Sequence, residues 1–158
     1  MRFQPGEIEG VQVREVSLHT DERGWLAEIF RSDQMEPKDT PAMGYISVTL
    51  PGAARGPHEH REQTDRFCFL GPGRFELRLW DNRDRSATYH NSKTLIVGDG
   101  KPSIVVIPPG VVHGYRNVGQ VDGLVINLPD RLYKGEGWRG PLDEIRHEAD
   151  PGNPFRMG

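Results

Sequence analysis

Short apolar segments separated by turn residues make up most of this chain. In residues 74–80, Phe75, Leu77 and Leu79 alternate with charged residues, which is typical of a half-buried β-strand. Other segments are rich in β-branched or aromatic residues and are too short for ordinary helices. They are residues 11–16, 24–30, 45–50, 66–70, 93–97, 103–107 and 123–128. We expect each to form a strand, and the first two to pair around the turn TDERG.

Glycine and proline punctuate the chain. Its 19 glycines and 13 prolines are grouped in turn motifs such as GPG at 71–73 and PPG at 108–110. Helical patterns are weak, with room for a turn or two near residues 32–35 and after Pro141. Strands at a spacing of roughly ten residues indicate an all-β sandwich or barrel. The length predicts a single domain, residues 1–158.

The charge balance argues against several classes of partner. With 20 basic and 23 acidic residues the formal net charge is -3, which favours neither nucleic acid nor an anionic membrane. The longest aliphatic run, residues 104–107, is far too short to span a bilayer, and we expect a cytoplasmic protein. Cys68, the single cysteine, lies in the apolar run FCFL and is expected to be a small buried hydrophobe.

Two histidine segments carry the candidate chemistry. In RGPHEHREQTD, residues 55–65, His58 and His60 are two residues apart and would point to the same face of a strand. In PPGVVHGYRN, residues 108–117, a proline-rich turn precedes His113. Together the two segments resemble the two sequence motifs of the cupins.

The cupin resemblance implies a fold and a pocket. The fold would be a double-stranded β-helix, a small jelly-roll barrel, here with a short C-terminal extension. All three histidines could then share the open interior. The first motif departs from the cupin pattern at its acid, which is usually a glutamate; the nearest candidates here are Glu62 and Asp65.

The flanking segments resemble one cupin family more closely. The chain contains D-x-R-G at 21–24, R-G-x-H at 55–58 and I-P-P-G-x-x-H-G at 107–114. Their order and distances are similar to those of the dTDP-4-dehydrorhamnose 3,5-epimerases, and the likeness runs from about Ile8 to Tyr133. The resemblance implies a cofactor-free isomerase of a dTDP-4-keto-6-deoxyhexose in deoxysugar and cell-surface polysaccharide synthesis.

The resemblance also implies roles for single residues. His58 would be the general base, because an imidazole can remove the acidic proton next to a ketone, and His113 and His60 would complete the catalytic pocket. Arginines and an acid would hold the nucleotide, since a planar guanidinium can bond two diphosphate oxygens at once. These substrate-binding residues are Arg23, Glu28 and Arg55.

Three residues of the family have no direct counterpart. Counting along the strand after the second histidine segment places Ile126, a hydrocarbon, at the tyrosine general acid. The late aspartate that orients the base is absent, and Asp143 and Glu144 are the candidates to replace it. The lysine that steadies the enolate is also absent, and Arg66 or His60 would donate in its place.

Two alternatives remain open. A mixed set of imidazoles and one carboxylate is typical of a site for a divalent transition metal ion. Its ligands would be His58, His60 and His113 with Asp65 or Glu62. The other alternative is a non-catalytic cupin that binds a sugar nucleotide.

The expected partners are a nucleotide-sugar substrate and a second copy of the chain. The family pairs its barrels, which implies a homodimer in which the D-x-R-G hairpin reaches the partner's site. Trp138, in the loop YKGEGWRG, is a candidate for a pocket lid or a dimer contact.

Overall fold

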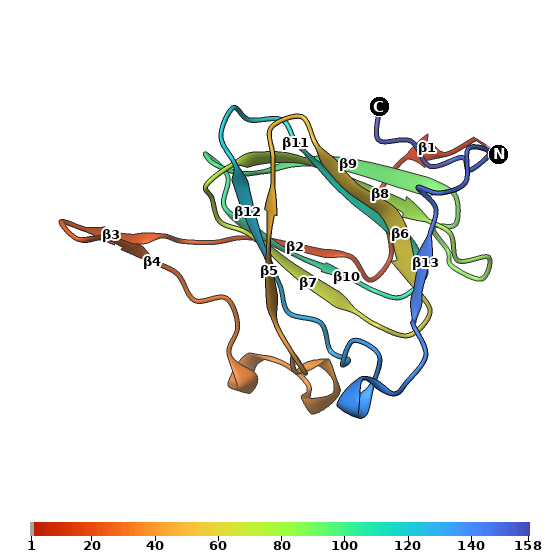
Figure 1. Ribbon diagram of the computed structural model, residues 1–158, viewed down its shortest axis with the longest axis horizontal. Coiled ribbons are helices and arrows are strands. Elements are labelled where there is room, and N and C mark those ends of the chain that lie inside the picture. The colour runs from red at the N-terminus through yellow and green to blue at the C-terminus, as the bar shows by residue number, and fades with distance from the viewer. Residues whose placement is uncertain (1) are drawn as a thin grey trace.

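Two β-sheets face each other in the computed structural model, which describes residues 2–158 (Figure 1). The larger sheet has the order β1 (Gln4–Pro5), β9 (Asn91–Gly98), β8 (Arg74–Asp81), β11 (Val111–Asn117), β6 (Ala54–His60) and β13 (Glu144–Arg146). The smaller sheet has the order β2 (Gln12–Glu15), β10 (Ser103–Ile107), β7 (Asp65–Phe69), β12 (Gly123–Asn127) and β5 (Tyr45–Thr49). The predicted all-β cupin fold, a jelly roll of two packed sheets, is confirmed.

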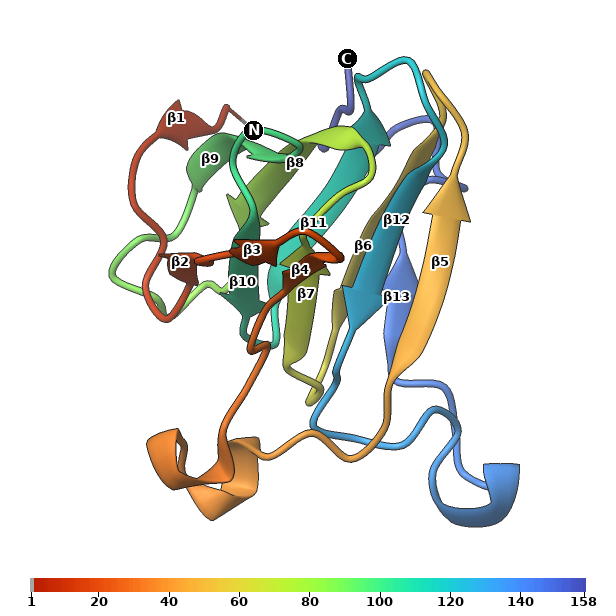
Figure 2. The ribbon, with the colours of Figure 1, turned by 90° about the vertical axis from the view of Figure 1, so that its left-hand side faces the viewer.

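A separate hairpin and three short 3-10 turns complete the described chain. The hairpin consists of β3 (His19–Asp21) and β4 (Gly24–Leu26) and extends away from the two sheets as an arm. The 3-10 turns are η1 (Ser32–Gln34), η2 (Pro37–Asp39) and η3 (Glu136–Trp138). All three lie at the same end of the sandwich, with η3 on the opposite side from η1 and η2, as Figure 2 shows. No helix within residues 2–158 is long and apolar enough to cross a membrane.

The predicted strands of the middle of the chain are present, and the pairing near the amino terminus differs from the prediction. Residues 11–16 were expected to pair around the turn TDERG, but β2 joins β10 in the smaller sheet. The turn is instead closed by β3 and β4, whose residues pair from His19 with Leu26 to Asp21 with Gly24. The segment 24–30 forms a strand over Gly24–Leu26 only.

The core lies between the inner faces of the two sheets. It is built from alternating residues of β7, β8 and β11, because every second side chain of a strand points inward. Phe67, Phe69, Phe75 and Tyr115 form its aromatic centre, with neighbouring ring centroids 5.5–5.9 Å apart. Cys68 points the other way and is buried in a smaller apolar cluster, and burial raises the pKa of its thiol to about 11. The prediction that this cysteine is a buried hydrophobe is confirmed.

The C-terminal segment is tied to the outside of the larger sheet. β13 pairs antiparallel with β6, the strand that carries the first two histidines. Further along, Phe155 and Met157 pack against Trp80 and Val112 in a second apolar cluster. The extension therefore holds β13 at the edge of β6.

Candidate active site

A cavity of about 1060 Å³ opens between the ends of the two sheets. Its walls come from β5, β6, β11 and β13, and its rim comes from the loop of residues 129–142. The volume lies at the upper end of the range for small-molecule sites. Trp138 stands on the rim with 74% of its surface exposed, and it is available for contact with a ligand or another chain.

The three histidines converge at the inner wall of this cavity. His58 and His60 point inward from β6, while Glu59 between them faces the other side and receives hydrogen bonds from Asn82 and His147. In the β6–β11 ladder His58 lies directly opposite His113, and the two ring centroids are 4.4 Å apart. The structure thus brings together the histidines of both sequence segments.

The acid of the cluster is Asp65, the first residue of β7. Its Oδ2 lies 3.1 Å from Nε2 of His60 and 3.1 Å from Nε2 of His113. Asp65 is 1% exposed, and its Oδ1 accepts hydrogen bonds of 2.8 Å from the side-chain amides of Gln63 and Asn127. Donor atoms of His58, His60, Asp65 and His113 all lie within 4.8 Å of one another.

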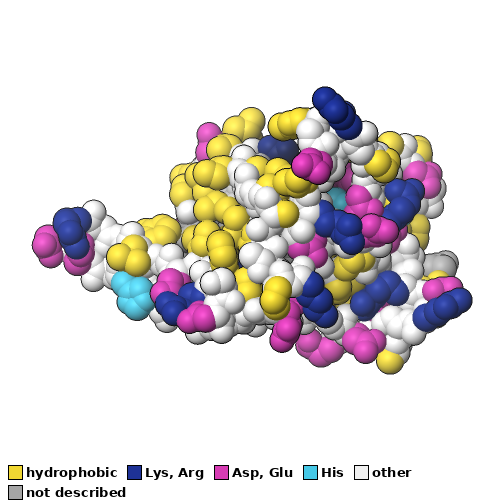
Figure 3. Space-filling model, turned by 90° about the horizontal axis from the view of Figure 1, so that it is seen from below, with side chains coloured by type: hydrophobic (Ala, Val, Ile, Leu, Met, Phe, Trp, Pro, Cys, Tyr) yellow, Lys and Arg dark blue, Asp and Glu magenta, His cyan; other side chains and the backbone are white. Residues whose placement is uncertain are grey.

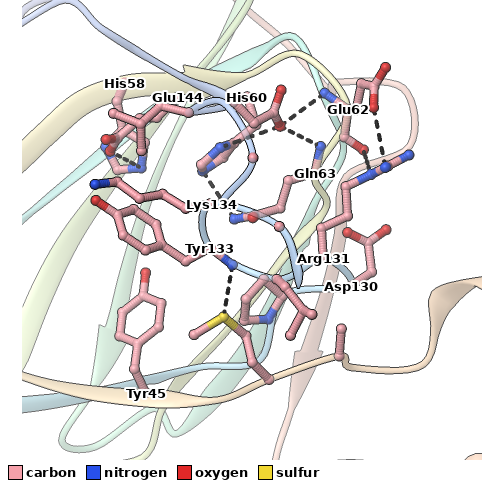
Figure 4. Close-up of a pocket in the computed structure, with 18 of the residues that line it drawn as sticks. Tyr45, His58, His60, Glu62, Gln63, Asp130, Arg131, Tyr133, Lys134 and Glu144 are labelled. Carbon is pink, nitrogen blue, oxygen red and sulfur yellow. Dashed lines mark hydrogen bonds and ion pairs between the residues drawn. The ribbon is translucent and has the colours of Figure 1, made fainter. Parts of the chain in front are cut away.

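The other acid proposed from the sequence, Glu62, does not join this cluster. Its carboxylate is 66% exposed and forms an ion pair of 3.2 Å with Arg131 at the cavity rim (Figure 4).

The pKa values of the clustered residues are shifted in different directions. Burial, reinforced by the neighbouring His113, holds the pKa of His58 well below its usual value, so this ring is neutral at physiological pH. Burial opposes charge on His60 as well, but the contact with Asp65 outweighs it and raises the pKa of His60. Burial alone would raise the pKa of Asp65, whereas the contacts with His113 and His60 keep it well below its usual value. His58 is therefore the imidazole best suited to accept a proton.

A second pair of acids comes from the C-terminal extension. Oε1 of Glu144 lies 3.9 Å from Nε2 of His58. The neighbouring Asp143 accepts backbone N–H bonds at the β6–β7 turn, from Arg61, Glu62 and Gln63. Of the two acids that the sequence offered as a replacement for the orienting aspartate, Glu144 is the one beside His58.

The expected substrate-binding residues lie in different places. Arg55 lines the cavity, where it donates hydrogen bonds to Oγ1 of Thr49 and to the carbonyl of Val48. Arg23 sits at the tip of the hairpin, far from its own cavity, with an 81% exposed side chain paired to Asp21. Glu28 is exposed beyond the hairpin and pairs with Arg31 at 3.7 Å. Only Arg55 of this set reaches the cavity of its own chain.

Arg66 was expected to face the substrate, and the structure does not bring it to the cavity. Strand alternation turns Asp65 and Phe67 inward and leaves Arg66 on the outer face of the sheet. The inward position next to the histidines is Asp65, an acid.

Comparison with known proteins places this chain in a family. The profile of the dTDP-4-dehydrorhamnose 3,5-epimerases matches residues 5–137. The chain belongs to this epimerase family. It is 37% identical over 130 residues to a probable low-salt glycan biosynthesis epimerase, Agl13, of Haloferax volcanii, covering 82% of this chain and 83% of the relative. It is 32% identical over 126 residues to the spore coat polysaccharide biosynthesis protein SpsL of Bacillus subtilis, covering 80% and 82%.

Solved structures of the epimerase family share the fold. A dTDP sugar isomerase from Desulfovibrio desulfuricans superposes with a TM-score of 0.79 at 25% identity, covering 94% of this chain and 91% of that one. ChmJ, a 3'-monoepimerase from Streptomyces bikiniensis solved with dTDP-quinovose, gives a TM-score of 0.75 at 22% identity, covering 92% and 72%.

Ile126, which the sequence placed at the family's tyrosine, does not face the cavity, and a tyrosine from another strand does. Ile126, the position reached by counting, packs outward in the apolar cluster of Cys68. The inward residue next to Ile126 at the end of β12 is Asn127, and directly opposite it in the ladder stands Tyr45 of β5. Asn127 donates a 2.9 Å hydrogen bond to the Tyr45 hydroxyl.

Three tyrosines therefore line the cavity: Tyr45, Tyr115 and Tyr133. Figure 4 shows Tyr133 and Tyr45 pointing into the same space as His58. Tyr45 has no role assigned from the sequence, because an aromatic residue in a short strand is more often part of the core than of a site.

Proposed function

We propose that this family member is a sugar-nucleotide epimerase or isomerase that acts on a dTDP-4-keto-6-deoxyhexose by removing a proton next to the ketone. The observation that carries the proposal is the setting of His58. Its ring is neutral, faces the cavity with 15% of its side chain exposed, and has the Glu144 carboxylate 3.9 Å from Nε2. A neutral imidazole with an acid behind it is the arrangement that general-base catalysis requires.

The chemistry follows from that arrangement. His58 takes the proton from a carbon next to C4, and the electrons of the C–H bond form a double bond to C4. The ketone oxygen then becomes an enolate oxygen. Glu144 stabilises the imidazolium that results, as an acid behind a histidine base does. Return of a proton to the opposite face of the carbon inverts it, and return at another position isomerises the sugar.

Tyr45 is the proposed donor of the returning proton. Its hydroxyl oxygen accepts the hydrogen bond from Asn127, which leaves its own hydrogen free for a ligand in the cavity. Burial raises the pKa of Tyr45 to about 12, so the phenol stays protonated at physiological pH. A phenol on β5 would thus take the role that the family gives to a tyrosine on the strand after the second histidine segment.

The nucleotide diphosphate would be held by arginines from two chains. Arg55 lies in the cavity wall, and Arg131 and Lys134 lie on its rim. Arg23 cannot reach its own cavity, and we propose that the hairpin delivers it to the cavity of a partner in a homodimer. Two apolar areas support such a dimer: Trp25 and Leu26 on the hairpin are 49% and 63% exposed, and an outer row of β5 is also open. This row consists of Ile46 and Val48, and it is continued by Leu50 just after the strand.

The arm and the nearby surface fit this assembly. Figure 3 shows hydrophobic side chains gathered beside the arm, which ends in charged residues. An apolar area of this kind is expected to be covered in solution. The product would enter the synthesis of a surface polysaccharide, for example a lipopolysaccharide, in line with the glycan and spore-coat polysaccharide roles in the names of the two relatives.

The test is exchange of solvent deuterium into dTDP-4-keto-6-deoxyglucose. Native protein in deuterated water should label a carbon next to C4, and His58→Ala should lose about a hundredfold to ten-thousandfold of the rate. His19→Ala is the matched control, because His19 is an exposed histidine on the hairpin strand β3. Mass spectrometry with NMR locates the label.

The outcomes separate the alternatives from the proposal. Labelling that His58→Ala abolishes and His19→Ala retains supports it. Binding of the sugar nucleotide by native protein without any labelling would show a binding cupin instead of an enzyme. Undiminished labelling by His58→Ala would place the base on another residue.

A further inference from the structure

We propose that His147 and Glu59 are positioning residues for Glu144. Their contact holds β13 against β6 on the outer face of the larger sheet, and so keeps the Glu144 carboxylate beside His58. The inference rests on the proposed function, because there Glu144 stabilises the imidazolium that His58 becomes. It is carried by the hydrogen bonds and the ring contact that His147 makes away from the cavity.

Strand pairing alone holds β13 weakly. The strand has three residues and lies at the edge of the larger sheet, so within residues 2–158 it pairs with β6 and with no other strand. A short edge strand contributes few ladder hydrogen bonds. The place of its side chains in the cavity therefore depends on how the two ends of the strand are fixed.

Side chains alternate between the two faces along β13 and the residue that follows it. Glu144 and Arg146 lie on the cavity face, where their side chains are 2.8 Å apart. Ile145 lies directly opposite Glu59 in the ladder and shares its outer face, and His147 continues this row. Glu59 and His147 thus meet on the side of the sheet opposite to the histidine cluster.

The buried Glu59 carboxylate is the acceptor of this contact. Nε2 of His147 donates to Oε1 of Glu59 at 2.8 Å, because a carboxylate oxygen can only accept. The same oxygen accepts a 2.9 Å hydrogen bond from Asn82, which follows β8. The side chains of Glu59 and His147 are only 8% and 18% exposed. Loss of the His147 donor therefore costs more than loss of a surface contact would.

The backbone and the ring of His147 are fixed as well. Its N–H donates to the carbonyl of Pro57 at 2.9 Å, and its carbonyl accepts a 2.8 Å hydrogen bond from the Asn153 side chain. Its ring centroid lies 4.7 Å from that of Phe155, which packs against Trp80 in the second apolar cluster. His147 therefore ties the end of β13 both to β6 and to the packed C-terminal extension.

Glu144 lies between this anchor and another at the start of β13. The second anchor is Asp143, which accepts backbone N–H bonds from the turn after β6. With both ends held, Oε1 of Glu144 is 3.9 Å from Nε2 of His58. A misplacement of about 1 Å, caused by a substitution far from the chemistry, can cost on the order of a hundredfold in rate.

The test compares His147→Leu with native protein on dTDP-4-keto-6-deoxyglucose. The kcat should fall by about tenfold to a hundredfold while KM stays close to native, because His147 lies outside the set of residues that line the cavity. His147→Gln should recover most of the rate, since its amide N–H can take the place of Nε2–H. Arg156→Gln is the matched control, because this exposed side chain of the same extension bonds the Pro151 carbonyl.

A second substitution separates positioning from a general loss of structure. If His147 acts through Glu144, His147→Leu should lower kcat no further in a Glu144→Gln background. An equal loss in both backgrounds overturns the proposal, as does native kcat in folded His147→Leu. Circular dichroism and thermal unfolding identify a variant that fails to fold. His147→Ser is then the second variant, since water can enter the space and hydrate the Glu59 carboxylate.

A measurement without substrate keeps this inference separate from the proposed function. Long-range ¹H–¹⁵N NMR spectra report the ring nitrogens of the histidines, and His58 is assigned by its absence from the spectrum of His58→Ala. The His58 signal should move in His147→Leu in the same direction as in Glu144→Gln. A His58 signal that stays native in His147→Leu overturns the inference. Native protein that exchanges no deuterium, but shows the expected movement, removes only the proposed reaction.

Discussion

The carboxylate of Glu144 lies 3.9 Å from Nε2 of His58, although Glu144 pairs across the strand ladder with His60. Its side chain leans along β6 toward the neighbouring histidine, and Arg146 holds it there with a 2.8 Å contact. The C-terminal extension thus places an acid beside His58 through one added strand, at the edge of the histidine strand.

Replacement of Glu144 by glutamine should slow the reaction without weakening binding. The carboxylate stabilises the imidazolium that forms when His58 takes the proton, and loss of such a charge costs on the order of a hundredfold in kcat. KM should stay close to the native value, since Glu144 is placed to act through His58. Steady-state kinetics on the keto sugar nucleotide measure both quantities.

Glu148→Gln is the control for this change, because Glu148 is an exposed acid four residues further along. Glu144→Asp should recover part of the lost rate, since it restores the charge at a longer distance. An unchanged kcat in Glu144→Gln would show that the acid has no part in proton transfer.

Tyr45→Phe should separate deuterium exchange from inversion. His58 can return the proton or a deuteron to the same face of the carbon, so labelling of the substrate persists without the phenol. Inversion needs a donor on the opposite face and should fall by about a hundredfold or more. Chiral analysis of the labelled sugar gives the two rates. If Tyr133→Phe shows this split and Tyr45→Phe does not, the donor is the loop tyrosine.

An inactive variant and a weakly binding variant should together form one native-like site when they share a dimer. Arg23→Ala removes the hairpin contact with the diphosphate and should raise KM roughly tenfold, the effect of one charged hydrogen bond. In a mixed dimer with His58→Ala, one cavity combines an intact His58 with an intact Arg23 from the other chain. Co-expressed and doubly tagged mixed dimers should then show one native-like site per dimer.

The complementation has a clear negative outcome. If the hairpin serves its own chain, no site in the mixed dimer is complete, and activity stays at the level of the Arg23→Ala parent. A chain that runs as a monomer in light scattering at assay concentration would also exclude the shared site.

The sequence predicts the fold and the histidine cluster because both depend on local patterns. Alternating strands and glycine turns indicate the sandwich, and the two-residue spacing of His58 and His60 puts both on one face. The cupin resemblance of the segment that contains His113 implies that this residue shares the pocket. These patterns need no knowledge of how distant strands meet.

The residues that complete the site depend on pairings that no local pattern encodes. Glu144 reaches His58 only because β13 lies beside β6, and Tyr45 faces the cavity only because β5 lies beside β12. Ile126, reached by counting along β12, packs on the outer face of its sheet, and a shift of one residue in a strand moves a side chain from one face to the other. The same alternation of side chains along β7 turns Arg66 outward and Asp65 inward.

Low pH should destabilise the fold by protonating Asp81 at the end of β8. Its buried carboxylate accepts hydrogen bonds from Arg83, Ser86 and Thr88, which tie down the turn after the strand. Burial by itself would raise the pKa of Asp81, but these bonds outweigh it and lower the pKa to about 2. A depressed pKa in the folded state contributes stability that is complete above the ordinary pKa of 3.8. That contribution is lost as the pH falls from about 4 toward 2.

Asp81→Asn should therefore lower the free energy of unfolding by roughly 2 kcal/mol at neutral pH. The gap to the native protein should shrink as the pH falls below 4, because the native carboxyl becomes protonated there. Urea unfolding at a series of pH values measures this gap, with Asp84→Asn as the control, an exposed acid in the same turn. A gap that stays constant down to pH 2 would mean that the hydrogen-bond geometry, and not the charge of Asp81, stabilises the turn.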